Sequence, residues 1–344
     1  MDLKEYKKKT YALQKEGKEL YSYSRLTTTE ECWYEYYLTY IKRQQGHDNV
    51  WGISGTMIHE AHEKLYAGEV DKTYVSQKVD EFVDDMEVFG ISFPNEKIAE
   101  NWVKSMKHYA QNFTYIDGDN YIIEEPFLIK VDDNAYLRGF IDFQYTKDGK
   151  KYLVDWKTSS KFSGEKLHKA GRQLVLYSIA KELEGDPIDG AYWGMLKYLN
   201  FCFMQKNGKV KKKMCDRHKW IEQCKDKLLG YILDAGIDEF EAEIMIDEAI
   251  ESNSDAGLPA EVKEKYWIED SFVEYEITDE VKKEAWQFVL DKIQEVRLNS
   301  SWEPKKIDQQ NSFYCNFLCS HREDCEYIQQ YNDGFREDDD DIFE

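Results

Sequence analysis

Two aspartates and a lysine near the middle of the chain have the types and spacing that suit metal-dependent hydrolysis. Asp142, Asp155 and Lys157 lie in the stretch GFIDFQYTKDGKKYLVDWKTS, residues 139–159. Asp148-Gly149 separates two runs of alternating aromatic and aliphatic residues. This dipeptide is a strong signal for a two-residue turn, because both turn positions need a positive φ. We therefore predict a β-hairpin over this stretch.

The predicted turn fixes the register of the hairpin. Counting outward pairs Phe143 with Val154 and places Asp142 directly opposite Asp155. Because side chains alternate along a strand, Lys157 projects from the same face as both acids. Opposed like charges, with Cβ atoms ~5 Å apart, destabilise a sheet unless a cation lies between them. Oxygen ligands select Mg²⁺ or Mn²⁺, and an ammonium beside the metal positions water or neutralises charge on a phosphate. On these residues alone, the alternative is an exposed hairpin face with ordinary charges.

Helices upstream of the hairpin supply a further candidate ligand. The segment 54–66 is predicted to be a helix capped by Ser54, with His59 and Glu63 on one face at i,i+4. A single helical histidine is commonly a packing residue, so both interpretations of His59 stay open. Residues 70–117 have the pattern of two scaffold helices.

A strand and a crossover are predicted around the hairpin. The strand, 121–131, carries Glu124 and Glu125, either of which approaches the metal or faces solvent. A helix at 164–183 then leads to an apolar strand at 190–199. This is a β-α-β crossover, so the strand at 190–199 should run parallel to the strand of Asp155. The crossover helix carries Gln173 and Tyr177 at i,i+4, on one face near Asp155 and Lys157. These two residues either belong to the active site or form a capping or surface pair.

Composition limits the class of protein. The chain has 344 residues, enough for a full core, and no run of about 18 apolar residues. Its N-terminal sequence has no signal-peptide pattern, so we expect a cytoplasmic protein of a bacterial or phage-infected cell, without a membrane partner. We expect one domain over 1–335 and a disordered acidic tail over 336–344. This tail either solubilises the protein or binds a replication or recombination protein.

Charge is unevenly distributed. The net charge of −22 argues against non-specific binding to polyanions, but basic residues gather in 206–219, where a turn is expected at Asn207-Gly208. This stretch is either a DNA-contacting hairpin or a solvated loop. Its candidate DNA-binding residues are Lys209, Lys211, Lys212 and Lys213.

Cysteines near the C-terminus have metal-ligand spacing. Three of them, Cys315, Cys319 and Cys325, lie within eleven residues of one another. Cys32, in a predicted aromatic-rich helix over 21–41, is the candidate fourth ligand. Four thiolates suit a 4Fe-4S cluster or a structural Zn²⁺ site, and zinc held by three cysteines and His321 is a further alternative.

Taken together, these segments resemble the PD-(D/E)XK nuclease superfamily, in particular its RecB-like branch, over most of the chain. The resemblance is carried, in order, by SYSRLTTTEEC (22–32), GTMIHEAHE (55–63), GFID (139–142), VDWKTS (154–159) and Gln173-x-x-x-Tyr177. It implies an α/β fold of the restriction-endonuclease type, a mixed central sheet flanked by helices, with a catalytic core at about 50–200 and a helical and basic insertion at about 201–300.

The resemblance also implies roles for individual residues. The implied metal ligands are His59, Asp142, Asp155 and the main-chain carbonyl of Trp156. Lys157 would assist the water, Gln173 and Tyr177 would hold the DNA strand, and Glu63 and Glu125 are less securely placed candidates. The implied activity is that of a Mg²⁺- or Mn²⁺-dependent DNA exonuclease that processes free or single-stranded ends in recombination, repair or replication. Alternatives are a CRISPR-associated spacer-trimming nuclease and a non-catalytic adaptor that retains the fold.

Relatives of the AddB type and spacer-trimming nucleases hold a 4Fe-4S cluster with one N-terminal and three C-terminal cysteines. Cys32, Cys315, Cys319 and Cys325 match this order, which implies a cluster that joins the chain ends. The match departs at one point: three residues separate Cys315 from Cys319, where the usual pattern has two.

Overall fold

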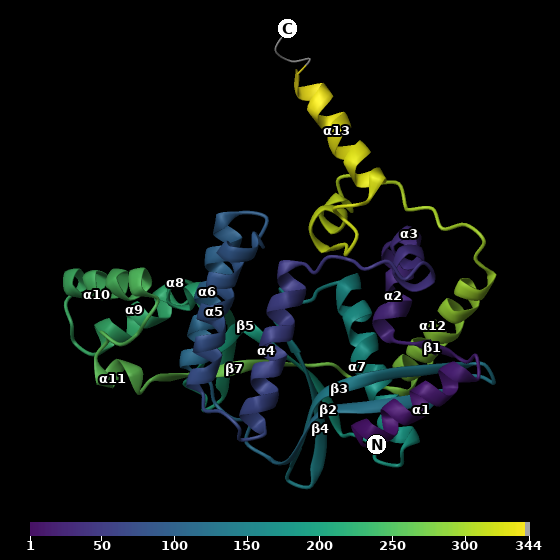
Figure 1. Cartoon of the computed structure of the whole chain (residues 1–344). Coiled ribbons are helices and arrows are strands. Elements are labelled where there is room, and N and C mark those ends of the chain that lie inside the picture. The colour runs from purple at the N-terminus through teal and green to yellow at the C-terminus, as the bar shows by residue number, and fades with distance from the viewer. Residues whose placement is uncertain (341–344) are drawn as a thin grey trace.

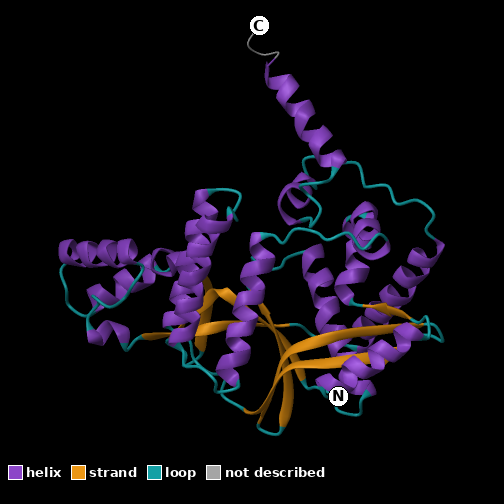
Figure 2. Ribbon diagram, viewed as in Figure 1, coloured by secondary structure: helices purple, strands orange, loops and turns teal. Residues whose placement is uncertain are grey.

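The computed structural model describes residues 1–340, and residues 341–344 lie outside the described part. In the described residues, a mixed sheet of seven strands runs through the molecule, and helices pack against it (Figure 2). The strands are β1 (Glu19–Tyr21), β2 (Asp119–Lys130), β3 (Ala135–Lys147), β4 (Lys150–Lys157), β5 (Gly190–Met204), β6 (Val210–Asp216) and β7 (Tyr266–Glu274). Their order is β1-β3-β4-β5-β6, with β2 also paired to β3 and β7 to β5.

Helices account for most of the remaining chain (Figure 1). The α-helices are α1 (Leu3–Lys15), α2 (Tyr23–Glu31), α3 (Trp33–Tyr36), α4 (Val50–Tyr66), α5 (Thr73–Phe89), α6 (Glu96–Gln111), α7 (Glu165–Leu183), α8 (Trp220–Gln223), α9 (Lys225–Asp234), α10 (Glu239–Ser252), α11 (Ala260–Lys263), α12 (Asp279–Leu298) and α13 (Glu326–Asp340). Short turns of other types are η1 (Tyr37–Ile41), η2 (Arg217–Lys219) and η3 (Tyr314–Leu318). Within residues 1–340 no helix is both long and apolar enough to cross a membrane.

The predicted hairpin is present in the predicted register. Phe143 pairs with Val154, and the turn residues Asp148 and Gly149 have φ angles of 52° and 73°. The β3–β4 ladder ends at the Phe143–Val154 pair, and further along the same edge of β3 the short strand β1 pairs with residues 135–137. Residues 138–142 of β3 therefore border a gap in the sheet, and Asp142 lies in that gap.

The predicted crossover is also confirmed. β4 and β5 are parallel, with Asp155 paired to Trp193, and α7 connects them. Side chains then alternate between two cores. Leu153 joins the core under α2, α7 and α12, whereas Val154 and Trp156 join the core under α4, α5 and α6. Asp155 and Lys157 share the parity of Leu153, so both point toward α7.

A third core stabilises an accessory unit at one end of the molecule. Its helices α8 to α11 lie together beyond α5 and α6 (Figure 1). They pack on the distal half of β5, which runs to Met204 rather than ending near 199, and on β6 and β7. The helix α12, placed by sequence in the insertion at 201–300, instead packs on α7 in the main core.

The aromatic-rich segment 21–41 is not one helix. Cys32 has an extended backbone, with φ −157° and ψ 120°, and it separates α2 from α3. The prediction of one helix was wrong because the helical pattern of side chains continues on both sides of Cys32, whereas the tertiary structure sets the extended backbone of that residue. Cys32 therefore lies at the N-terminal end of α3, where free main-chain amides are available.

Two further boundaries differ from the prediction. The helix that carries His59 begins at Val50, and its N-cap is Asn49, whose side chain accepts a hydrogen bond of 2.9 Å from the Gly52 amide. Ser54, the predicted cap, is buried inside the helix. At the other end of the chain α13 projects from the body and runs to Asp340 (Figure 1), past the start of the predicted tail at 336, and the disorder of that tail stays a prediction. The rest of that tail lies outside the described residues.

Candidate active site

Asp155 and Lys157 form a buried ion pair on β4. Asp155 is 1% exposed, and its Oδ1 and Oδ2 lie 3.0 and 2.7 Å from Lys157 Nζ. Burial lowers the pKa of Lys157, but the Asp155 and Asp142 carboxylates outweigh that effect and raise it overall, so the ammonium stays charged. Oδ2 of Asp155 is buried and accepts no well-aligned hydrogen bond from any described residue. The Lys157 ammonium, 2.7 Å away, nevertheless neutralises this oxygen in the protein without metal.

The side chain of Asp142 accepts a hydrogen bond from β4 just beyond the last paired residues of β3 and β4. Its Oδ2 accepts a hydrogen bond of 3.3 Å from the Trp156 amide, and its side chain is 11% exposed. Burial raises the pKa of Asp142 well above its ordinary value, and the nearby charge of Asp155 raises it further. The two acids therefore disfavour each other's charge in the protein without metal, as the hairpin register predicts.

His59 joins α4 to this pair through the main chain of Trp156. The His59 Nε2–H donates a hydrogen bond of 3.0 Å to the Trp156 carbonyl, which assigns the tautomer and leaves a lone pair on Nδ1. Nδ1 lies 3.6 Å from Oδ2 of Asp142. Burial lowers the pKa of His59, so the ring is neutral. Two electron-rich atoms then face each other, and a cation between them would satisfy both.

Glu124 completes the cluster. Ligand atoms of His59, Glu124 and Asp142 lie within 4.8 Å of one another. Glu124 has a φ of 49°, a left-handed conformation that costs about 1–3 kcal/mol in a residue other than glycine. Its pKa is raised by burial and by the charges of Glu63 and Asp155. Both observations indicate a carboxylate held where it is unfavourable without a cation.

Glu125 lies elsewhere. Its carboxylate accepts hydrogen bonds of 2.9 Å from Lys181 of α7 and 2.6 Å from Gln144. The structure thus brings Glu124, and not Glu125, to the candidate metal site. Regular alternation along β2 gives no signal for this choice, because the left-handed residue changes which face each side chain meets.

Gln173 and Tyr177 extend the site along α7. Gln173 Oε1 accepts a hydrogen bond of 3.2 Å from Lys157, and Gln173 Nε2 donates one of 2.7 Å to the Tyr177 hydroxyl. This chain of contacts fixes the position of the lysine. His62, one turn after His59, contacts Tyr109 at 2.6 Å; burial lowers its pKa to about 3 and it is a packing residue.

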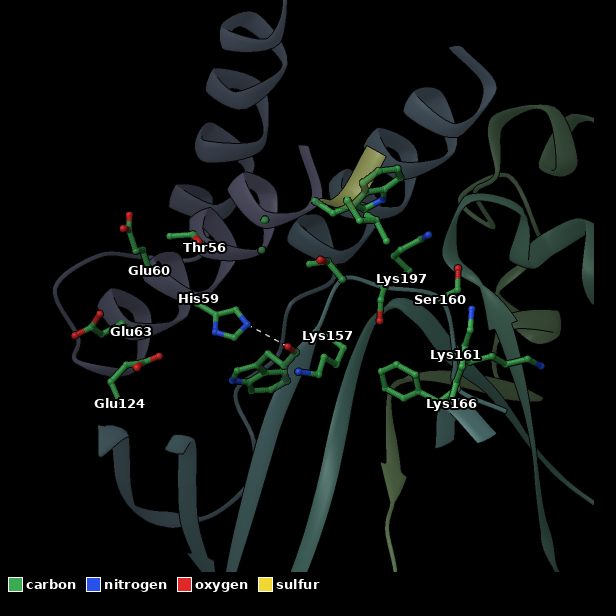
Figure 3. A pocket seen from close by; sticks show the side chains of 18 of the residues that line it. Thr56, His59, Glu60, Glu63, Glu124, Lys157, Ser160, Lys161, Lys166 and Lys197 are labelled. Atoms are coloured by element: carbon green, nitrogen blue, oxygen red, sulfur yellow. Dashed lines mark hydrogen bonds between the residues drawn. The ribbon is translucent and has the colours of Figure 1, made fainter. Parts of the chain in front are cut away.

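A groove of about 990 Å³ opens beside His59 and Lys157. In Figure 3, Glu60, Glu63 and Glu124 gather on one side of His59, while the labelled lysines lie on the other. Three of these lysines were not singled out from sequence: Lys161, Lys166 and Lys197. They come from the β4–α7 connection, α7 and β5, so no sequence cluster marks them. A second cavity, of about 550 Å³, shares His59 and Glu124 with the groove and reaches Asp142, Gln173 and Tyr177.

The basic stretch predicted at 206–219 forms the β5–β6 hairpin and does not line this groove. Lys212 pairs with Glu269, and Lys213 bonds the main chain of Gln223. The four candidates Lys209, Lys211, Lys212 and Lys213 are solvent-exposed on the accessory unit.

The four candidate cluster ligands gather in space. Cys32, Cys315, Cys319 and Cys325 line one cavity of about 180 Å³, although 283 residues separate the first two in sequence. Burial raises the pKa of the Cys32 thiol, whereas hydrogen bonds from the main-chain amides of Glu35 and Tyr34 lower it. No three of these sulfur atoms lie within 4.8 Å of one another.

The cysteine segment also supports the helix of His59. Asn49, which caps α4, donates a hydrogen bond of 2.9 Å to the Leu318 carbonyl. The His47 amide donates one of 2.7 Å to the Ser320 carbonyl, and Arg322 bonds the carbonyls of His47 and Asp48. The position of His59 therefore depends on the order of residues far along the chain.

One of three comparisons with known proteins identifies a family. A family profile described as the PD-(D/E)XK nuclease superfamily matches residues 21–326. Among solved structures, one described as "Crystal structure of SSO0001" is 13% identical over 69% of this chain and 78% of that chain, with a TM-score of 0.24, too low to support any conclusion. No curated protein matches the chain. The family profile covers most of the chain, from α2 to the last cysteine, and the chain therefore belongs to the PD-(D/E)XK nuclease superfamily.

Proposed function

We propose that the chain is a Mg²⁺- or Mn²⁺-dependent DNA exonuclease that processes DNA ends in recombination, repair or replication. The observation that carries this proposal is the facing pair of His59 Nδ1 and Asp142 Oδ2, 3.6 Å apart, with Glu124 beside them. An imidazole nitrogen and carboxylate oxygens form a donor set for a divalent ion.

The residues that would hold the ion are His59, Glu124, Asp142 and Asp155. Their fit is supported by the facing atoms of His59 and Asp142 and by the burial that raises the pKa of Asp142 and of Glu124. When bound, a divalent ion in such a site polarises a phosphoryl oxygen and lowers the pKa of a coordinated water. The Trp156 carbonyl, bonded to His59, orients that imidazole.

Lys157 has a role of its own. The carboxylates of Asp155 and Asp142 raise the pKa of Lys157, so its ammonium is charged and can donate hydrogen bonds to a phosphate or to the attacking water. It lies beside Asp155 and is held by Gln173, so it would neutralise negative charge that develops on the phosphate during attack. Gln173 and Tyr177 act as positioning residues for this lysine and line the second cavity, where one end of the cleaved strand would lie.

DNA would bind along the groove. The lysines Lys161, Lys166 and Lys197 line it, and no described carboxylate pairs with them, although the chain carries a net charge of −22. Unpaired cations in a strongly acidic chain favour an anionic ligand. The exposed lysines at 209–213 are proposed to contact DNA farther from the site.

We also propose that residues 1–335 form one nuclease domain and that the four cysteines bind a 4Fe-4S cluster. The four cysteines line one cavity, and main-chain amides donate hydrogen bonds to Cys32, which supports a shared metal centre at this position. The tail, 336–344, is proposed to bind a partner or to solubilise the protein.

The experiment that tests the activity uses end-labelled linear DNA and covalently closed circular DNA, each with Mn²⁺ or with EDTA. Wild type should degrade linear DNA only with metal and spare the circle. Lys157→Ala should abolish cleavage, while Lys150→Ala, an exposed lysine of the same hairpin, should cleave like wild type. Metal-independent cleavage, or full activity in Lys157→Ala, would refute the proposal.

A further inference from the structure

Two aromatic rings line the proposed DNA groove, and each contacts a further ring outside it. Trp51 of α4 and Phe313 both line the groove, and their ring centroids are 5.8 Å apart. The row continues from Phe313 to Phe317 at 5.2 Å and from Trp51 to Phe93 at 5.7 Å. The row thus joins two segments that are distant in sequence, the start of α4 and the stretch before the cysteines.

Phe313 is the exposed member of this row. Its side chain is 46% exposed, whereas Phe93 is buried in the core under α4. Phe313 therefore presents a ring to the groove while its neighbours hold it in place. Contiguous apolar surface beside a charged cleft is a feature of binding sites, and Phe313 together with Trp51 supplies such a surface at this groove.

The groove pairs this ring surface with a cationic one. Figure 3 shows the C-terminal segment, in yellow, above His59 and Lys157, with Lys161 and Lys166 below and to one side. Lysines that are not ion-paired suit phosphates, and aromatic faces suit unpaired bases, because every base has a π face. In a duplex the bases already stack on each other and cannot reach such a ring.

We infer that Trp51 and Phe313 form a stacking surface for unpaired bases, which makes single-stranded DNA the preferred ligand of the groove. This inference rests on the proposed function for the identity of the groove, and it adds which form of DNA the groove selects and which residues select it.

The test is DNA binding by the full-length protein in EDTA, measured by fluorescence anisotropy with a labelled oligothymidylate and with a blunt-ended duplex of two separate strands. Phe313→Leu keeps an apolar side chain and removes the ring, and it should weaken binding of the single strand about tenfold, within the range observed for base stacking on aromatic residues. Binding of the duplex should stay unchanged. Phe313→Tyr should bind the strand like wild type.

Phe240→Leu is the matched control, because Phe240 is 76% exposed on α10, outside the groove. It should change neither affinity. The inference is overturned if Phe313→Leu leaves strand binding unchanged, if it weakens strand and duplex equally, or if Phe313→Tyr is as defective as Phe313→Leu. A cleavage assay on wild type separates the two proposals: absence of metal-dependent cleavage refutes the proposed function, and the ratio of strand to duplex affinity still decides this inference.

Discussion

Replacing Asp142 by Asn should stabilise the protein without metal while it removes metal binding. Asp142 is nearly buried, lies opposite the buried Asp155 and has a raised pKa. The amide of Asn resembles the protonated carboxyl in shape but carries no charge. Function and stability are therefore expected to change in opposite directions, as they do at sites that hold unfavourable charges for a ligand.

The size of the effect follows from the geometry. Two like charges about 5 Å apart repel by about 3 kcal/mol at an effective dielectric constant of about 20. The positive charge of Lys157, which pairs with Asp155, offsets part of this repulsion. We therefore expect Asp142→Asn to raise the free energy of unfolding by about 1–3 kcal/mol. Unfolding 344 residues at about 2.1 cal/mol/K each gives an entropy of about 0.7 kcal/mol/K. The Tm in EDTA should then rise by about 1–4 °C.

The sign of the pH dependence is part of this prediction. A carboxyl whose pKa is raised on folding contributes full stability below its unfolded pKa, near 4, and loses it as the pH rises through the folded pKa. The advantage of Asp142→Asn over wild type should therefore grow above pH 4. Thermal melts in EDTA at several pH values measure it, with Asp148→Asn in the exposed turn as the control.

Metal should reverse the order. Mn²⁺ at about 100 times its dissociation constant should stabilise wild type by about 2.7 kcal/mol and Asp142→Asn by much less. The reasoning is refuted if Asp142→Asn melts below wild type in EDTA at pH 8, or if Mn²⁺ stabilises both proteins equally.

Other predictions concern the supports of the site. Cys32→Ala should lower the iron content of anaerobically purified protein and lower the Tm, and a variant with normal iron would exclude Cys32 as a ligand. Gly194→Ala should destabilise the fold by about 1–3 kcal/mol, because the added methyl meets the Trp156 ring, and an unchanged Tm would contradict that contact. Deleting residues 338–344 should leave cleavage of naked DNA unchanged or raised, and a collapse of activity would show that the tail belongs to the catalytic unit.

The hairpin could be predicted from sequence because its determinants are local. Asp148-Gly149 sets the turn, and counting from the turn fixes which side chains face each other. The pairing of β4 with β5 followed from chain connectivity in the same way. The family resemblance added His59, whose surroundings in the helix alone left its role open.

Other parts of the site depend on tertiary structure. Glu124 reaches the cluster because its backbone is left-handed. Its sequence gives no sign of this conformation, since the residue is not a glycine. The groove lysines come from separate elements, and a search for basic stretches found the hairpin at 206–219 instead. Helical periodicity gave no sign of the break at Cys32. The cap at Asn49 could have been predicted, because Asn is a preferred N-cap residue, but Ser54 was chosen instead.

The central claim is that His59, Glu124, Asp142 and Asp155 form the metal site that hydrolyses phosphodiesters. Glu124 and Glu125 are neighbours with the same side chain, and only Glu124 lies at that site. The most direct measurement is the Mn²⁺ affinity, by calorimetry, and the Mn²⁺-dependent cleavage rate of linear DNA for Glu124→Gln and Glu125→Gln. We predict that Glu124→Gln weakens both at least tenfold, as loss of a charged ligand should, while Glu125→Gln lowers the Tm and leaves Mn²⁺ affinity unchanged. Equal loss of Mn²⁺ affinity in the two variants, or loss in Glu125→Gln alone, would contradict the account.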